Sequence, residues 1–173
     1  LGAFVEGVGV PEIVKSEGLF NLVYSGLLEH EVLFFEDQEI PASVLEQFAG
    51  LFGSLLGHGA YDLVEGTRAI QILESTKDKP SKIEVWHSDM TFMQSPPTFT
   101  MLHSQIIPSY GGDTMWASAR AAYDALSSNM KVLLEEIDAE HAFRQGFKES
   151  LAEPGGEDRL KDALAQYPKV VHP

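Results

Sequence analysis

The stretch EVWHSDMTF, residues 84–92, places a histidine and an aspartate two positions apart, at His87 and Asp89. Apolar residues flank the pair on both sides, and this alternation predicts a short β-strand. Side chains at positions i and i+2 of a strand project from the same face. The sequence therefore predicts that an imidazole and a carboxylate lie together beside a hydrophobic surface.

Three kinds of site are consistent with this pair. Imidazole nitrogen and carboxylate oxygen are both ligands of divalent metals, so the pair could supply two adjacent donors while a third comes from elsewhere. Alternatively, Asp89 could orient His87 for acid–base catalysis. The pair could also be a hydrogen-bonded structural feature at the end of a strand. The motif H-x-D alone leaves these alternatives open.

Composition narrows the class of protein. The chain has 173 residues, enough for one domain with a hydrophobic core. It carries 12 Lys and Arg against 26 Asp and Glu, a formal net charge of −14, so we expect neither nucleic acid nor an anionic membrane as a partner. The absence of cysteine excludes disulfide scaffolds, thiolate metal sites and cysteine nucleophiles, and is typical of a cytoplasmic enzyme. No apolar run is long enough to span a bilayer.

Periodicity and turn residues predict a mixture of helices and strands. Helical spacing or capping residues predict helices over residues 16–32, 41–53, 118–126, 129–137 and 158–167. Apolar or alternating runs predict strands over residues 32–37, 69–75 and 98–107, and a further strand starts at Val170. Regular β-α-β alternation is lacking, which argues against a doubly wound parallel sheet. We expect an α+β protein or a β jelly roll decorated with helices.

A longer pattern surrounds the opening motif. WHSDMTF is followed by SPP, then by GGDT and AAYDALS, within residues 86–127. In order and spacing these motifs resemble the iron(II)/2-oxoglutarate-dependent taurine dioxygenase family. Upstream, HEVLFFEDQEI and FAGLFGSLLGHG are similar to the same family, and so is AEHAFRQGF downstream. The resemblance extends over nearly all of the chain.

The resemblance implies a fold and an activity. The fold is a mainly β, cupin-like double-stranded β-helix, or jelly roll, with flanking helices. We expect residues 1–173 to form a single dioxygenase domain, with its N-terminal and central parts present and its C-terminal strands missing. The implied reaction uses Fe(II), 2-oxoglutarate and O2 to hydroxylate a small, anionic, taurine- or sulfonate-like substrate, giving succinate and CO2. The resemblance leaves a homo-oligomer, dimer or tetramer, open.

The resemblance also implies roles for individual residues. His87 and Asp89 match the first two iron ligands and are the candidate catalytic residues. Thr114, at the end of GGDT, matches a threonine whose hydroxyl donates to a carboxylate of 2-oxoglutarate. The alternative for Thr114 is a β-branched strand residue that follows a turn.

Three further residues match positions that contact the substrate. His58 matches a histidine that binds the acidic group of the substrate, and Met90 and Phe147 match residues that line the same pocket. A histidine in a surface loop, and apolar side chains that only fill a core, are the alternatives.

The chain departs from the family pattern in its metal ligands. His172 lies in PKVVHP, a context that precedes the family's distal iron histidine, so we do not assign His172 as the third ligand. That distal histidine and the arginines that pair with 2-oxoglutarate and with an anionic substrate are not found. A non-catalytic cupin-like binding protein with an incomplete iron site is therefore the alternative. Hydrolytic His–Asp chemistry ranks third, because no nucleophile elbow is present.

Overall fold

The computed structural model describes residues 1–57, 61–78, 80 and 85–173, and these form two compact units. Unit 1 contains residues 1–55, 64–70 and 101–128, and unit 2 contains residues 56–63, 71–100 and 129–173. Both units draw on segments that are far apart in the sequence. His87 and the final residues of the chain thus belong to the same unit.

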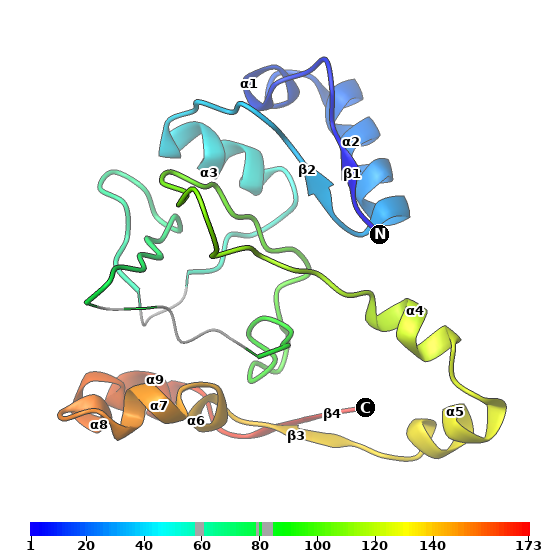
Figure 1. Cartoon of the computed structure of the whole chain (residues 1–173), viewed down its shortest axis with the longest axis vertical. Helices are drawn as coiled ribbons and strands as arrows, with labels where there is room; N and C mark the ends of the chain where they lie inside the picture. Colours follow the sequence, from blue (N-terminus) through cyan, green and yellow to red (C-terminus); the bar gives the residue numbers. More distant parts are fainter. Residues whose placement is uncertain (58–60, 79, 81–84) are drawn as a thin grey trace. The chain divides into compact units, whose positions relative to one another are not determined.

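Unit 1 combines a two-stranded parallel sheet with four helices, which Figure 1 labels α1 to α4. Ala3 pairs with Leu33, and Phe4 pairs with Phe34. The core contains Val10, Ile13, Val23 and Phe48. The elements are β1 (Ala3–Phe4), α1 (Val10–Ile13), α2 (Glu17–His30), β2 (Leu33–Phe34), α3 (Ala42–Gly50) and α4 (Ala119–Asp124).

Local sequence explains the longest helix. The Ser16 hydroxyl accepts a hydrogen bond from the Leu19 backbone N–H at 3.3 Å, which caps the N-terminus of α2. Val23 is buried, and Glu31 ends the helix in a left-handed conformation with φ 67°. The helix predicted for residues 16–32 is confirmed with these narrower bounds, and α3 confirms the helix predicted for residues 41–53.

Unit 2 combines an antiparallel strand pair with short helices (Figure 1). In the strand pair, His141 lies opposite Val170 and Ala139 lies opposite His172. Phe92, Phe143, Leu160 and Ala163 form the core of this unit, the Phe143 cluster. The elements are α5 (Ser128–Glu135, whose first residue belongs to unit 1), β3 (Ala139–His141), α6 (Phe143–Gly146), α7 (Lys148–Ala152), α8 (Gly156–Arg159), α9 (Lys161–Gln166) and β4 (Val170–His172).

Most helix predictions for the second half of the chain are confirmed. Ser118 caps α4 by accepting from the Ala121 backbone N–H at 3.0 Å, as the sequence predicts, and α5 lies within residues 129–137 except for its first residue. The helix predicted for residues 158–167 is interrupted at Leu160, which is buried in the Phe143 cluster. Leu160, with φ −103° and ψ 8°, is the C-cap of α8 and the N-cap of α9.

Two predicted strands are wrong. Residues 69–75 form only an isolated bridge between Gln71 and Leu63, and residues 98–107 form no strand. A strand requires a hydrogen-bonding neighbour, and an alternating pattern does not supply one. Residues 62–64 pair with residues 70–72 through two backbone hydrogen bonds only, and among the described residues no strand pairs with residues 98–107. The expected mixture of α and β structure is present, but its sheets are small.

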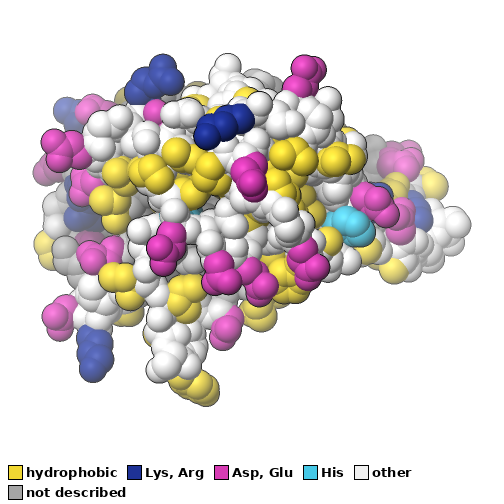
Figure 2. Space-filling view, turned by 90° about the horizontal axis from the view of Figure 1, so that it is seen from above, with side chains coloured by type: hydrophobic (Ala, Val, Ile, Leu, Met, Phe, Trp, Pro, Cys, Tyr) yellow, Lys and Arg dark blue, Asp and Glu magenta, His cyan; other side chains and the backbone are white. Residues whose placement is uncertain are grey.

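The acidic composition is visible on the surface. Figure 2 shows more acidic than basic side chains on the face seen from above, spread among hydrophobic patches. This distribution agrees with the formal net charge of −14.

Within the described ranges, no helix combines the length and apolar character needed to cross a membrane.

Candidate metal centre

His87 and Asp89 lie together in unit 2. The Nε2 atom of His87 is 3.1 Å from Oδ1 of Asp89, and the two side chains are 48% and 44% exposed. Both groups are thus reachable from solvent. The prediction that they meet is confirmed by this contact.

The predicted strand around this pair is wrong, because a turn follows Asp89. Met90 has a left-handed φ of 52°, and its carbonyl accepts from the Met93 backbone N–H at 3.0 Å. This conformation interrupts an extended backbone immediately after the aspartate. The turn, and not strand alternation, therefore sets the direction of the Asp89 side chain.

A backbone carbonyl fixes the orientation of His87. The Nδ1 atom lies 2.9 Å from the Val85 carbonyl oxygen. A carbonyl oxygen only accepts, so Nδ1 carries a proton; Nε2 has a lone pair when the ring is neutral and a second proton when it is charged. Nε2 faces Asp89 Oδ1, which is an acceptor. The two atoms are stable together at this distance only with a proton or a cation between them.

The geometry fits two neighbouring ligands of one metal ion. Two donor atoms bound at right angles, each about 2.1 Å from a divalent metal, lie about 3 Å apart. The observed 3.1 Å agrees with this value. A histidine that binds metal through one ring nitrogen commonly donates its other N–H to a backbone carbonyl, as His87 does to Val85. One nitrogen and one carboxylate oxygen suit Fe(II) and similar ions.

The pair provides two ligands only. Among the described residues, no cluster of three His, Cys, Asp or Glu side chains is arranged to hold a metal ion. His172 already has partners, because its Nε2 lies 2.9 Å from the Thr91 carbonyl oxygen and 3.1 Å from that of Met93. Both partners are acceptors, so this nitrogen carries a proton and holds the turn after Asp89.

Two side chains that the sequence did not predict, Thr100 and Tyr61, interact with Asp89. The Thr100 hydroxyl donates to Asp89 Oδ2 at 2.9 Å. Tyr61 is half-buried, and its pKa is raised by burial and also by the negative charge of Asp89, so its phenol stays protonated at neutral pH. The sequence contains no signal for the Thr100 contact, which arises because residues 90–99 fold back. For Tyr61, the available sequence signal is its position three residues after His58.

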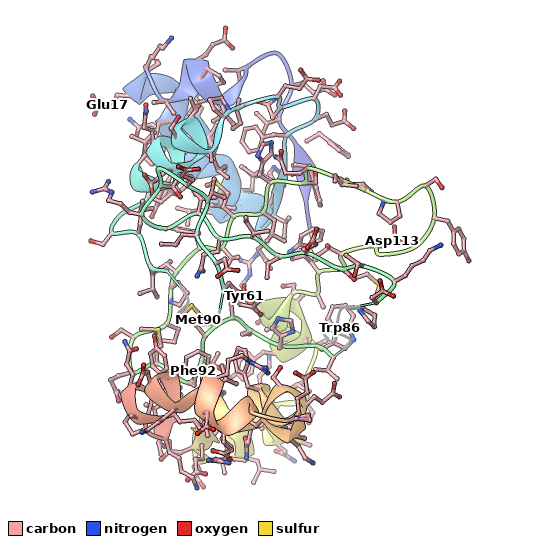
Figure 3. All side chains as sticks on the ribbon, turned by 90° about the vertical axis from the view of Figure 1, so that its left-hand side faces the viewer. Glu17, Tyr61, Trp86, Met90, Phe92 and Asp113 are labelled. Atoms are coloured by element: carbon pink, nitrogen blue, oxygen red, sulfur yellow. The ribbon has the colours of Figure 1, made fainter. Side chains whose placement is uncertain are left out.

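Met90 and Phe147 both pack against the Phe143 cluster. The Phe147 ring stacks on that of Phe143, with ring centroids 4.3 Å apart and an angle of 13° between the planes. Figure 3 shows Met90 close to Phe92, beside the helices of unit 2. Both residues are partly buried, so each contributes to the core next to the His87–Asp89 pair.

The structure describes one of the two remaining predicted site residues. Thr114 belongs to unit 1, where it is exposed and outside any strand, between Gly112 and α4. Gly111 and Gly112 each have a φ of 76°, a conformation that glycine adopts readily. His58 lies outside the described residues.

Comparison with known proteins identifies the family. A model of the family described as "Taurine catabolism dioxygenase TauD, TfdA family" matches residues 3–173. The chain belongs to the TauD/TfdA family. An alkylsulfatase of Acinetobacter baylyi is 33% identical over 183 aligned positions, which cover 100% of this chain and 57% of that protein.

Other relatives extend this comparison. An alpha-ketoglutarate-dependent sulfate ester dioxygenase of Pseudomonas putida is 31% identical over 82% of this chain and 46% of its own length. The crystal structure of AAD-2 in complex with Mn(II) and N-oxalylglycine matches with a TM-score of 0.71 at 24% identity, over 99% of this chain and 59% of AAD-2. The chain therefore shares the fold of that part of AAD-2, and it spans about half the length of these relatives.

Proposed function

We propose that this TauD/TfdA-family chain contributes two iron ligands, His87 and Asp89, to a non-haem Fe(II)- and 2-oxoglutarate-dependent dioxygenase. The observation that carries the proposal is the 3.1 Å separation of His87 Nε2 and Asp89 Oδ1, with Nδ1 bonded to a backbone carbonyl. A histidine that binds a metal through one ring nitrogen commonly donates its other N–H to a backbone carbonyl, as His87 does. The relatives named as dioxygenases support the same activity.

The proposed reaction converts substrate, 2-oxoglutarate and O2 into hydroxylated product, succinate and CO2. Bound Fe(II) supplies the redox chemistry, and the protein supplies position and exclusion of water. His87 presents its Nε2 lone pair and Asp89 presents a carboxylate oxygen to the metal. Thr114 is proposed to donate its hydroxyl to a carboxylate of 2-oxoglutarate.

A small organic anion is the proposed substrate. The relatives are named as an alkylsulfatase and a sulfate ester dioxygenase, so a sulfate ester or sulfonate is favoured. An anion needs a local donor in a chain with a net charge of −14. We assign that role to His58, with Met90 and Phe147 lining the apolar part of the pocket.

A single domain that spans both units is also proposed. One family model covers residues 3–173 and therefore both units. The similarity to AAD-2, over 59% of that chain, supports a double-stranded β-helix as the complete fold. A third metal ligand is then expected from outside the described part of this chain.

The test uses the full-length protein. Anaerobic addition of Fe(II) and 2-oxoglutarate should produce a weak visible charge-transfer band, and a sulfate ester or sulfonate should then stimulate succinate release in air. A protein that shows neither the band nor the succinate contradicts the proposal. Absence of both signals would favour the alternative, a non-catalytic cupin-like binding protein. That alternative is motivated by the lack of a third ligand among the described residues.

A further inference from the structure

The two oxygens of the Asp89 carboxylate have different partners. Oδ1 lies 3.1 Å from His87 Nε2, and Oδ2 accepts a hydrogen bond of 2.9 Å from the Thr100 hydroxyl. The carboxylate therefore has one oxygen directed towards the histidine and one directed away from it. An aspartate without this second bond would turn readily, because rotation about its terminal torsion is broad and nearly two-fold.

The hydroxyl of Thr100 is well suited to hold this orientation. A threonine is β-branched, so its χ1 angle has few accessible values. Its bond to Asp89 is charge-assisted and is stronger than a bond between two neutral groups. With one lone pair of Oδ2 occupied by the hydroxyl, Oδ1 is the better electron donor to a metal.

The loop between the two residues is anchored in the core. Phe92 is buried in the Phe143 cluster, and its ring meets that of Phe143 edge-on at 5.1 Å. The Nε2 atom of His172 is hydrogen-bonded to the carbonyl oxygens of Thr91 and Met93. The Thr100–Asp89 bond thus joins the two ends of a loop whose first part is already fixed.

We propose that Thr100 is a positioning residue that orients Asp89 so that it binds the metal through Oδ1 alone. A carboxylate can bind a metal through one oxygen or through both. One-oxygen binding leaves a coordination position that the second oxygen would otherwise occupy, and 2-oxoglutarate needs such positions to chelate. This inference rests on the proposed function, because it presupposes a metal between His87 and Asp89.

The experiment compares Thr100→Val with Thr100→Ser in the full-length protein. Mn(II) is the probe, since it shares the preference for nitrogen and carboxylate ligands and can be followed by its magnetic resonance spectrum. Thr100→Val should weaken Mn(II) binding by about 10- to 100-fold, the usual effect of removing a hydrogen bond to a metal ligand. It should also change the spectrum of the bound ion at saturating Mn(II). Thr100→Ser, which keeps the hydroxyl, should restore both.

Two controls separate positioning from folding. Thr98 is exposed and lies two residues earlier on the same segment, so Thr98→Val should bind Mn(II) like the wild type. The thermal unfolding midpoint of metal-free Thr100→Val should lie below that of Thr98→Val only by the loss of one exposed hydrogen bond, and Thr100→Ser should restore it. A lower midpoint for Thr100→Val together with no rescue by serine would show that Thr100 only stabilises the loop, and would overturn the inference.

The outcomes also separate this inference from the proposed function. If wild type binds Mn(II) and Thr100→Val binds it equally well with the same spectrum, only the proposed role of Thr100 is overturned and the metal centre is not. Wild-type protein that fails to bind Mn(II) overturns the proposed metal centre, and the role of Thr100 with it.

Discussion

At the scale of single residues, the site depends on which atoms carry protons. His87 donates through Nδ1 to the Val85 carbonyl, and its Nε2 faces Oδ1 of Asp89 with either a proton or a cation between them. Each group alone is an ordinary exposed side chain. Together they form a pair that holds a proton between them or, as proposed, a metal ion.

Removal of the carboxylate should abolish tight metal binding. We expect Asp89→Ala to lose high-affinity Fe(II) binding and activity, because the carboxylate is one of the two proposed iron ligands and the only charged one of the pair. The fold should survive, since the side chain is 44% exposed. Anaerobic Fe(II) titration with an indicator measures the effect. As a control, Asp78→Ala removes an exposed carboxylate from the same unit and should bind Fe(II) like the wild type. Unchanged Fe(II) affinity in Asp89→Ala would refute the ligand assignment.

Thr114→Val tests the proposed contact with 2-oxoglutarate. This variant keeps the shape of the side chain and removes the hydroxyl. Loss of one hydrogen bond to a charged group corresponds to about 1.5–3 kcal/mol, so a higher concentration of 2-oxoglutarate should be needed, with little change for the substrate. The measurement is succinate release as a function of 2-oxoglutarate concentration, with Thr98→Val as the matched control. If 2-oxoglutarate dependence is unaltered, Thr114 has no such role.

At the scale of elements, β4 holds the turn that carries Asp89. His172 donates from Nε2 to two carbonyls of that turn, and its ring meets the His141 ring edge-on at 5.2 Å. The last strand of the chain thus supports a segment some eighty positions earlier. Pairing with β3 places the histidine at this point.

His172→Phe should therefore loosen the turn without removing a ligand. The aromatic ring remains, but both carbonyls lose their donor, and we expect the free energy of unfolding to fall by roughly 1–3 kcal/mol. Iron affinity should fall less than in Asp89→Ala. Chemical denaturation and metal titration measure the two effects, with His141→Phe as a control on the neighbouring strand. A loss of iron binding as complete as in Asp89→Ala would instead make His172 a ligand.

An ion pair links α6 to α8 in the same unit. Arg144 forms two hydrogen bonds with Glu157, at 2.6 Å and 3.2 Å. These bonds, and then the charge of Arg144, lower the pKa of the Glu157 carboxyl. Because the folded-state pKa lies below the unfolded value, the stabilisation is present above the unfolded pKa and is lost as pH falls through the folded pKa.

Glu157→Gln should therefore be less stable than wild type at neutral pH, by a small amount because the pair is exposed and screened. The difference in thermal unfolding midpoint should disappear at acidic pH and shrink in high salt. Glu149→Gln on α7 is the control and should lack this pH dependence. A difference that persists below the folded pKa of Glu157 would indicate a cause other than the ion pair.

At the scale of the whole molecule, the acidic surface poses a problem for an anionic substrate. With a net charge of −14, the chain as a whole repels an anion, so the anionic substrate proposed above requires hydrogen-bond donors close to it. Relatives named for sulfate esters show that such anions are compatible with this family.

His58→Ala tests the substrate class. If His58 donates to the anionic group, its removal leaves a desolvated anion without a partner, and substrate affinity should fall by about tenfold or more. Binding of Fe(II) and 2-oxoglutarate should hardly change. The measurement is the substrate-induced change in the iron spectrum, titrated in wild type and variant, with His30→Ala on α2 as a histidine control. Equal titrations would favour a substrate without an anionic head group.

Sequence patterns determined the parts of this protein that depend on near neighbours. The Ser16 and Ser118 caps, the spacing of apolar residues in α2 and the His87–Asp89 contact all join residues a few positions apart, so their energetics are local. The family was also recognisable from the motifs within residues 86–127.

Tertiary structure decided everything that requires two distant segments. The strands expected at residues 69–75 and 98–107 did not form, because a strand is stabilised by a partner that the pattern does not specify. Thr100 reaches Asp89 because Phe92, in the loop between them, is buried in the Phe143 cluster, and His172 reaches Thr91 because β4 pairs with β3. Such contacts follow from chain folding over long separations, whose outcome is set by packing of the whole unit and not by local propensity.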